Sequence, residues 1–198
     1  METNVFDQMA NQYDTDDRIQ LAKCILDQLG PFLQNTNENS LLDFGCGTGL
    51  LGIPLCSHYK NVMLCDNSSS MLEVANFKIN SQGIKNAKTM SPSDLALDKS
   101  FLVDNILLSL VLLHIPDTQS ILKFPYDHLK PNGKLLIVDF CKNEKVSHPK
   151  IHTGFKLEDL ESILTTIGYQ TVSSNVILEE KKVFMNHDAS LFLLIAEK

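Results

Sequence analysis

Apolar runs and helical patterns alternate along most of this 198-residue chain. Each apolar run is short and ends in a polar or glycine-rich turn, which is typical of a buried strand. Between the runs, apolar residues recur at spacings of three and four, as on one face of an amphipathic helix. The alternation predicts βαβ units, and we expect an α/β fold: a doubly wound, mainly parallel sheet of about seven strands, with helices on both faces and an antiparallel C-terminal strand.

Turn and capping signals place the expected elements along the chain. We expect strands in the runs 40–47, 61–66, 86–91, 104–115, 133–140, 169–182 and 190–198. We expect helical segments over 5–33, 50–59, 68–83, 118–129 and 156–168, and polar turns over 91–98, 130–133 and 186–188. Residues 5–13 are the least periodic part of the first helical segment, and we expect them to act as a mobile lid.

Composition and charge exclude several classes of protein. Hydrophobic residues make up 43% and charged residues 21% of the chain, which is typical of one globular domain. The net charge is −7 and Arg18 is the only arginine, a balance that argues against a nucleic-acid partner. No apolar run reaches the length of a membrane span and the N-terminus lacks the basic and apolar parts of a secretion signal, so we expect a cytoplasmic protein.

The five cysteines contain no C-x-x-C pair, which favours buried free thiols over disulfides or a zinc site. Beyond Asp139, no cluster of acids suggests a magnesium site, so we expect no metal. Oligomeric state is left open by the sequence.

The chemistry is expected where the strands end, because ligands of open α/β sheets bind outside the carboxyl ends of the strands. The first strand runs into Gly45, Gly47 and Gly49, a turn that lets a ligand approach the main chain. Asp66 ends the second strand, 21 residues after Gly45. A carboxylate there can accept hydrogen bonds from the two hydroxyls of a ribose.

Two cofactor classes fit this pair of features. Gly47, Gly49 and Gly52 satisfy G-x-G-x-x-G, the pattern of dinucleotide sites, so a nicotinamide cofactor remains an alternative. Asp43, however, lies two positions before Gly45, and an acid so close disfavours an anionic pyrophosphate. The amino group and sulfonium of S-adenosylmethionine tolerate such an acid, and this cofactor is favoured.

Successive motifs resemble those of the class I S-adenosylmethionine-dependent methyltransferases, which have a Rossmann-like fold. They are D-F-G-C-G-T-G, Asp66, Asp94, L-V-L-L-H-I-P-D and L-K-P-N-G-K-L, and they span about residues 40–140. The flanks F-D-Q-M-A-N-Q-Y-D and H-T-G-F-K-L-E-D-L-E-S-I-L-T-T-I-G-Y resemble the small-molecule branch, which contains the ubiquinone and menaquinone biosynthesis methyltransferases. The resemblance implies one methyltransferase domain over 1–198, with residues 1–33 as a helical lid and about 40–140 as the cofactor-binding core.

The resemblance also implies roles for particular residues around S-adenosylmethionine. The glycines Gly45, Gly47 and Gly49 would lie beneath its methionine and ribose, and Asp43 would position the amino group through the loop. Asp66 would hold the ribose hydroxyls. The remaining contacts would come from Tyr13 in the lid, Asn67 and Met71 beside the adenosine, Asp94 and Leu95 at the adenine amine, and Ser109 and Leu110 near the methyl donor.

Methyl transfer to a hydroxyl or an acidic carbon is helped by a base, and histidine is the commonest choice. His114 follows the fourth apolar run, and His152 lies between the fifth strand and the next helix. Both are candidate catalytic residues, with a structural role as the alternative. The sequence thus predicts an enzyme that methylates a small-molecule acceptor and releases S-adenosylhomocysteine. The alternatives are an NAD-dependent oxidoreductase and a non-catalytic cofactor-binding protein on the same fold.

Overall fold

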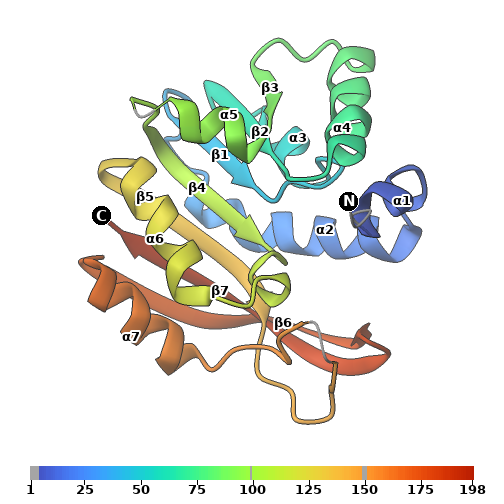
Figure 1. Ribbon diagram of the computed structural model, residues 1–198, viewed down its shortest axis with the longest axis vertical. Coiled ribbons are helices and arrows are strands. Elements are labelled where there is room, and N and C mark those ends of the chain that lie inside the picture. Colours follow the sequence, from blue (N-terminus) through green and yellow to red (C-terminus); the bar gives the residue numbers. More distant parts are fainter. Residues whose placement is uncertain (1–4, 99, 149–150) are drawn as a thin grey trace. The chain divides into compact units, whose positions relative to one another are not determined.

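The computed structural model describes residues 5–98, 100–148 and 151–198 (Figure 1). The chain divides into two compact units, Met1–Phe101 and Leu102–Lys198, each of which is described by itself. The first unit contains α1 (Val5–Met9), η1 (Ala10–Gln12), α2 (Asp16–Leu29), η2 (Gly30–Phe32), β1 (Ser40–Phe44), α3 (Gly52–Leu55), β2 (Asn61–Cys65), α4 (Ser69–Ser81), β3 (Ala87–Met90) and α5 (Pro92–Leu97). The second contains β4 (Val103–Ser109), η3 (Leu112–His114), α6 (Thr118–His128), β5 (Leu129–Phe140), α7 (Leu157–Ile167), β6 (Thr171–Phe184) and β7 (His187–Glu197).

Three parallel strands form the centre of the first unit, in the order β3-β2-β1. The apolar residues of β1 and β2 are buried, Leu42 and Val62 completely, except for the half-buried Met63. Helix α4 packs against β2 and β3, and it begins where the Ser68 hydroxyl accepts a hydrogen bond from the Met71 amide at 3.2 Å. Such a cap satisfies an amide at the first turn that has no partner within the helix.

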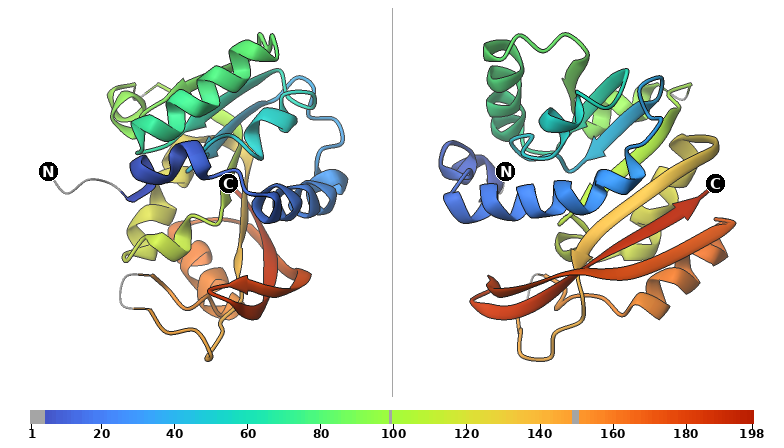
Figure 2. Two further views of the ribbon diagram at one scale, coloured as in Figure 1. Left: turned by 90° about the vertical axis from the view of Figure 1, so that its right-hand side faces the viewer. Right: turned by 180° about the vertical axis from the view of Figure 1, so that it is seen from behind.

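The second unit has two parallel strands, β4 and β5, followed by β7 and β6. Strand β7 is antiparallel to both β5 and β6. Helices α6 and α7 pack against each other and lie on the same side of these strands in Figures 1 and 2. Tyr126 of α6 meets Tyr169, just after α7, edge to face at 5.1 Å, and the Lys198 ammonium donates to the Tyr126 carbonyl at 2.6 Å.

The expected fold class is confirmed: the described residues form seven strands, mainly parallel, with an antiparallel strand at the C-terminus. Four local predictions need correction. The helix expected over 50–59 is only α3 (Gly52–Leu55), because the amides of residues 56–58 bond three rather than four residues back, in the tighter manner of a 3₁₀ turn. Residues 92–97 form the short helix α5 instead of a turn, closed at its start by a capping box between Ser91 and Asp94.

The other two corrections concern β4 and β5. Strand β4 ends at Ser109, not 115, although Leu112 and Leu113 beyond it are buried; the apolar run reflected burial rather than strand conformation. The turn expected over 130–133 is an irregular stretch within β5. Val103 of β4 pairs with Leu129, and pairing resumes only between Asn105 and Lys134, so most of the turn is looped out of the register.

All five cysteines are free, but only Cys46 and Cys65 are buried; Cys24, Cys56 and Cys141 are half-buried, so the expectation of buried thiols holds for two of them. Among the residues that the structure describes, no group of three or more His, Cys, Asp or Glu is placed to hold a metal ion. Within the same ranges, no helix combines the length and apolar character needed to cross a membrane.

Two glycines with positive φ provide a test of the fold. Gly154 has φ +88°, and an added Cβ would lie 2.2 Å from the Cys141 carbonyl oxygen; Gly83 has φ +67° and open space around it. Gly83→Ala should lower the free energy of unfolding by about 1 kcal/mol, through backbone strain alone. Gly154→Ala should lower it by roughly 3 kcal/mol or more, because the backbone must also move. Urea unfolding measures the free energy of unfolding of both variants. An equal decrease in the two would contradict the close packing around Gly154.

Candidate functional site

The glycine turn after β1 is tied to the end of β2. The amides of Gly45 and Cys46 both donate to the Cys65 carbonyl, at 2.7 and 3.0 Å. Gly45, Gly47 and Gly49 have φ of +81°, +54° and +81°, values that side chains other than glycine rarely adopt. The turn therefore requires the three glycines, and it presents its backbone at the carboxyl ends of β1 and β2.

Asp66 connects this turn to the start of α4. Its Oδ2 accepts a hydrogen bond from the Gly47 amide at 2.8 Å, and its Oδ1 accepts one from the Ser68 amide at 2.9 Å. These two bonds fix the carboxylate at the strand end. Each oxygen keeps a further lone pair, so the half-buried carboxylate can still accept two hydroxyl hydrogens from a ligand.

Asp43 is a buried carboxylate in β1, with an exposed fraction of 2%. Burial, reinforced by the charge of Asp66, raises its pKa to about 7, although the Gly52 amide opposes the shift. Its Oδ2 has no hydrogen-bond partner, and a Cβ on Gly52 would lie 2.5 Å from it. The absence of a side chain at Gly52 thus makes room for the Asp43 carboxyl group. Its Oδ2 remains available to accept a hydrogen bond beside the glycine turn.

The N-terminal segment is bound to the same region at two points. Asp7 accepts hydrogen bonds from the Ser68 hydroxyl at 2.6 Å and the Ser70 amide at 3.4 Å, at the start of α4. Asp14 accepts a hydrogen bond from the Thr48 hydroxyl and pairs with the Lys78 ammonium. Figure 2 shows α1 lying beside α4 in both views, as expected from these contacts.

Tyr13 lies between these two anchors, close to the glycine turn. A Cβ on Gly47 would meet the Tyr13 ring at 3.8 Å. The guanidinium of Arg18 stacks on the ring at 4.2 Å and donates to the Tyr13 carbonyl at 2.9 Å. Burial raises the pKa of Tyr13, so the phenol is neutral near pH 7 and can donate a hydrogen bond.

The other candidates of the first unit lie in different surroundings. Asn67 is exposed, whereas Met71 and Leu95 are buried in the core. Asp94 is exposed, and its carboxylate accepts hydrogen bonds from the Ser91 hydroxyl and amide, which lower its pKa. The structure thus gives Met71 and Leu95 packing roles and Asp94 a capping role, and any contact with a cofactor would be additional.

Ser109 and Leu110, in the second unit, mark the end of β4. The Ser109 hydroxyl is buried without a hydrogen-bond partner. Leu110 has φ +55°, an unusual conformation for a residue with a branched side chain, and its amide donates to the Val138 carbonyl at 2.8 Å. An unused polar atom beside a strained residue is common at functional sites.

The candidate base His114 lies in the turn η3 that follows Leu110, and the candidate base His152 lies between β5 and α7. Partial burial and the nearby His148 lower the pKa of His114, which favours the neutral ring that a base requires. The Nε2 of His152 lies 2.8 Å from the Ile115 carbonyl oxygen. Asp139 is fully buried in β5, and burial raises its pKa to about 7.

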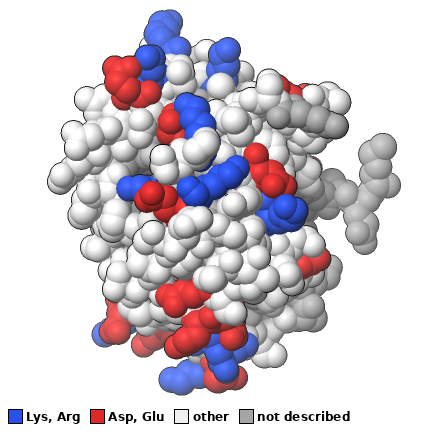
Figure 3. Space-filling view, turned by 90° about the vertical axis from the view of Figure 1, so that its left-hand side faces the viewer, with Lys and Arg blue, Asp and Glu red and all other residues white. Residues whose placement is uncertain are grey.

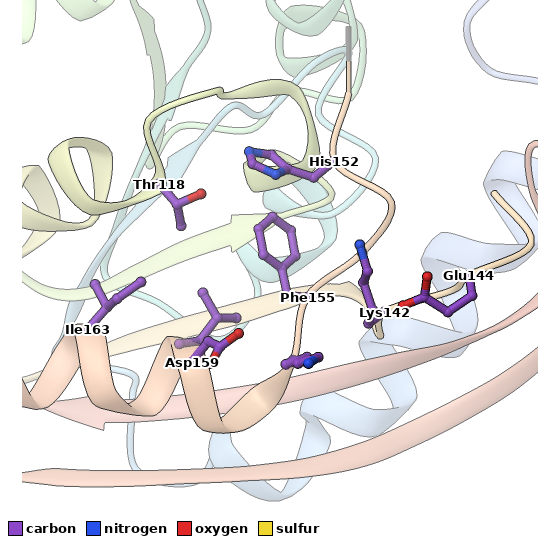
Figure 4. A pocket seen from close by; sticks show the side chains of 10 residues that line it. Thr118, Lys142, Glu144, His152, Phe155, Asp159 and Ile163 are labelled. Carbon is purple, nitrogen blue, oxygen red and sulfur yellow. The ribbon is translucent and has the colours of Figure 1, made fainter. Parts of the chain in front are cut away.

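A pocket of about 440 Å³ lies within the second unit (Figure 4). Apolar side chains from α7 and Phe155 form part of its lining, with His152 and charged side chains around them. The lining residues are Thr118, Lys142, Glu144, His152, Gly154, Phe155, Lys156, Asp159, Leu160 and Ile163. Its volume suits a small organic molecule.

Positive and negative side chains are mixed on the face shown in Figure 3. Blue and red groups lie next to one another there, without an extended basic area. The charges on this face are therefore balanced locally rather than gathered by sign.

Comparison with known proteins identifies the class. A family profile described as "Methyltransferase domain" matches residues 42–135. An uncharacterized methyltransferase of Schizosaccharomyces pombe is 33% identical over 121 residues, which are 57% of this chain and 43% of that protein. A ubiquinone biosynthesis O-methyltransferase of Pelagibacter ubique is 36% identical over 106 residues, covering 53% of this chain and 43% of that protein. The chain thus matches less than half the length of either relative.

Solved structures agree on the fold. A SAM-dependent methyltransferase from Aquifex aeolicus superposes with a TM-score of 0.69 at 20% identity, covering 96% of this chain and 97% of that one. The DhpI–SAH complex gives 0.72 at 17% identity, with 98% and 92% coverage. The [4+2]-cyclase SpnF gives 0.70 at 16% identity, with 87% and 80% coverage, so the same fold also carries other chemistry.

The chain has the α/β fold of the SAM-dependent methyltransferase structures to which it is similar. The family profile matches residues 42–135, and together with the relatives it confirms the resemblance seen in the sequence.

The pKa of Asp43 leads to a prediction about stability. A pKa raised from 3.8 to about 7 means that between about pH 4 and pH 7 the folded state keeps a proton that the unfolded chain has released. The free energy of unfolding should therefore fall as the pH rises through this window. Asp43→Asn removes the group, so the fall between pH 5 and pH 8 should be smaller.

Urea unfolding at both pH values measures this change. The exposed Asp27 provides the matched control, because Asp27→Asn should leave the pH dependence as in the parent protein. An Asp43→Asn protein with the parental pH dependence would show that Asp43 is ionised throughout.

Proposed function

We propose that the protein is an enzyme that transfers a methyl group from S-adenosylmethionine to a small-molecule acceptor and releases S-adenosylhomocysteine. The observation that carries the proposal is the carboxylate of Asp66, held at the end of β2 by the Gly47 and Ser68 amides. The family match over residues 42–135 supports the same assignment.

The residues of the first unit fit an adenosyl cofactor. Asp66 would accept the ribose hydroxyls, and the backbone of Gly45, Gly47 and Gly49 would lie against the ribose and methionine. The unused Oδ2 of Asp43 supports a role for this acid beside the methionine amino group. When bound, the cofactor supplies an activated methyl group on its sulfonium.

The remaining assignments around the cofactor stay predictions. Tyr13 would cover the glycine turn from the N-terminal segment, and Asp94 would read the adenine amine once released from its bonds with Ser91. Leu95, Asn67 and Met71 would contribute packing or backbone contacts. Ser109 and Leu110 would face the methyl donor, a role that the unpartnered Ser109 hydroxyl supports.

Several observations favour a small acceptor over a nucleic acid. The chain is acidic, and the face in Figure 3 mixes both charges. The relatives named for ubiquinone biosynthesis are O-methyltransferases, which favours an organic hydroxyl as the acceptor. A cytoplasmic location is part of the same proposal.

Catalysis would depend mainly on holding donor and acceptor in line, which can supply roughly 7 to 11 kcal/mol in favourable cases. His114 has the lowered pKa expected of a base that is neutral near pH 7. His152, whose Nε2 lies 2.8 Å from the Ile115 carbonyl oxygen, is the second candidate.

The two alternatives make different predictions. An NAD-dependent oxidoreductase would bind a dinucleotide at the glycine turn, and both Asp43 and the family match count against it. A cofactor-binding protein without catalysis would bind S-adenosylhomocysteine yet methylate nothing. The SpnF likeness shows that the fold alone does not exclude another chemistry.

Isothermal titration with S-adenosylhomocysteine tests the cofactor assignment. Asp66→Ala removes the acceptor of the ribose hydroxyls, and hydrogen bonds to a charged group contribute about 1.5–3 kcal/mol each. We expect micromolar binding to the parent protein and at least a tenfold weaker affinity for the variant. Asp27→Ala is the control and should bind as the parent does.

Titration with NAD runs in parallel. Binding of NAD but not S-adenosylhomocysteine would replace the proposal with the oxidoreductase. An unchanged affinity in Asp66→Ala would remove the ribose assignment.

The N-terminal lid can be tested through Lys78. Its ammonium pairs with Asp14 and donates to the Thr48 carbonyl at 2.9 Å, so it holds the segment to the glycine turn. Lys78→Met keeps the aliphatic stem but loses these bonds, which for a partly buried pair are worth about 1 kcal/mol. We expect the amides of residues 5–13 to exchange hydrogen about fivefold faster.

Mass spectrometry of deuterium uptake measures this exchange, with the exposed Lys85→Met as control. S-adenosylhomocysteine should slow exchange in the same segment of the parent protein. Exchange that neither substitution nor ligand alters would show that the segment is not a lid.

A further inference from the structure

The loop 110–115 connects β4 to the start of α6, and it carries the candidate base His114. It begins with the strained Leu110 and contains the short turn η3, whose Leu112 and Leu113 are buried. A strained backbone conformation such as that of Leu110 persists only where contacts with the surrounding structure stabilise it. Within the second unit, two residues bond to this loop, Asp139 and His152.

Asp139 holds the loop from β5. It is fully buried, and its Oδ2 accepts a hydrogen bond from the Leu113 amide at 3.3 Å. Its Oδ1 accepts one from the Phe140 amide at 2.8 Å, which orients the carboxyl group. Through these two bonds the buried Asp139 ties the loop to the end of β5.

His152 holds the loop from the other side. Its amide donates to the Leu113 carbonyl and its ring Nε2 to the Ile115 carbonyl, each at 2.8 Å. A carbonyl oxygen only accepts hydrogen bonds, so the neutral ring carries its proton on Nε2. Leu113 is therefore bonded through its amide to Asp139 and through its carbonyl to His152.

The segment that carries His152 is itself fixed to the end of β5. The Phe155 amide donates to the Phe140 carbonyl at 2.9 Å, and the Lys142 amide donates to the Phe155 carbonyl at 2.8 Å. The close approach of Gly154 to Cys141 belongs to the same contact. His152 thus acts on the loop from a rigid support, with its ring 5.1 Å from that of Phe155.

We propose that His152 and Asp139 are positioning residues that hold the loop 110–115, together with Ser109 and Leu110, which the proposed function assigns to the methyl donor, and that His152 is not the base. The proposal rests on the proposed function only where it concerns the cofactor. The hydrogen bonds of His152 to the loop are independent of any ligand. A base at Nε2 would have to give up its bond to Ile115, whereas a positioning residue uses that bond as it stands.

Three variants separate the two roles. His152→Ala removes the side-chain bond to the loop. His152→Gln offers an amide donor in its place but can neither accept a proton as a base nor carry a charge near pH 7. His187→Ala, at the exposed tip of the β6–β7 hairpin, is the matched control.

The first readout is deuterium uptake by peptides covering 110–115 in the protein without ligand. We expect uptake in His152→Ala to be about fivefold faster than in the parent protein, and His152→Gln and His187→Ala to resemble the parent. The second readout is the affinity for S-adenosylhomocysteine, expected to fall about fivefold in His152→Ala and to recover in His152→Gln.

Asp139→Leu and Asp139→Asn extend the test to the other positioning residue. The asparagine keeps an oxygen that can accept from Leu113, so Asp139→Asn should retain slow exchange and Asp139→Leu should lose it. If Asp139→Leu does not fold, the His152 variants still decide the proposal.

Parental uptake and affinity in His152→Ala would overturn the proposal, as would a His152→Gln protein that behaves like His152→Ala. If the parent protein does not bind S-adenosylhomocysteine, the proposed function fails, while the uptake of 110–115 still decides whether His152 holds the loop.

Discussion

The candidate cofactor site depends on the two hydrogen bonds that the Asp66 carboxylate accepts from backbone amides. The carboxylate connects the glycine turn, through the Gly47 amide, to the segment before α4, through the Ser68 amide. Ser68 caps α4 and bonds to Asp7 of the N-terminal segment. This strand-end acid therefore belongs to a hydrogen-bond network that includes the glycine turn, the start of α4 and the proposed lid. A ligand that bonds to Asp66 would stabilise the network as a whole.

Buried acids serve related purposes in the two units. Asp43 lies in β1 beside the glycine turn, and Asp139 lies in β5 where it holds the loop 110–115. Burial raises the pKa of each to about 7, so both contribute less to stability as the pH rises toward neutrality. Burying an ionised carboxylate lowers the stability of the folded state. Each of these acids nevertheless lies where it accepts a hydrogen bond from a backbone amide. In Asp43 the unused oxygen also supports a ligand contact.

The features of the fold that are local in sequence could be predicted, and those that depend on distant contacts could not. Strand positions, the Ser68 cap and the stop at Gly168 follow from apolar runs and capping residues nearby. The shortened α3, the end of β4 at Ser109 and the bonds of Lys78 depend on tertiary contacts. The glycines and Asp66 of the site were recognisable because their chemistry is tied to a fixed spacing. Asp139 belongs to no motif of fixed spacing, so its contact with the loop could not be predicted. Its one signal in the sequence is that it is an acid within an apolar strand, which indicates a buried polar contact.

The family match and the solved structures show the fold, whereas the reaction depends on what the site binds, since the [4+2]-cyclase SpnF has a similar fold. The central claim is that an adenosyl cofactor binds through Asp66. A crystal structure of the complex with S-adenosylhomocysteine tests it most directly, by the distances from the Asp66 oxygens to the ribose hydroxyls. The account predicts distances of about 2.5–3.0 Å for both hydroxyls. A ribose bound away from Asp66, with the glycine turn free of ligand, would contradict it.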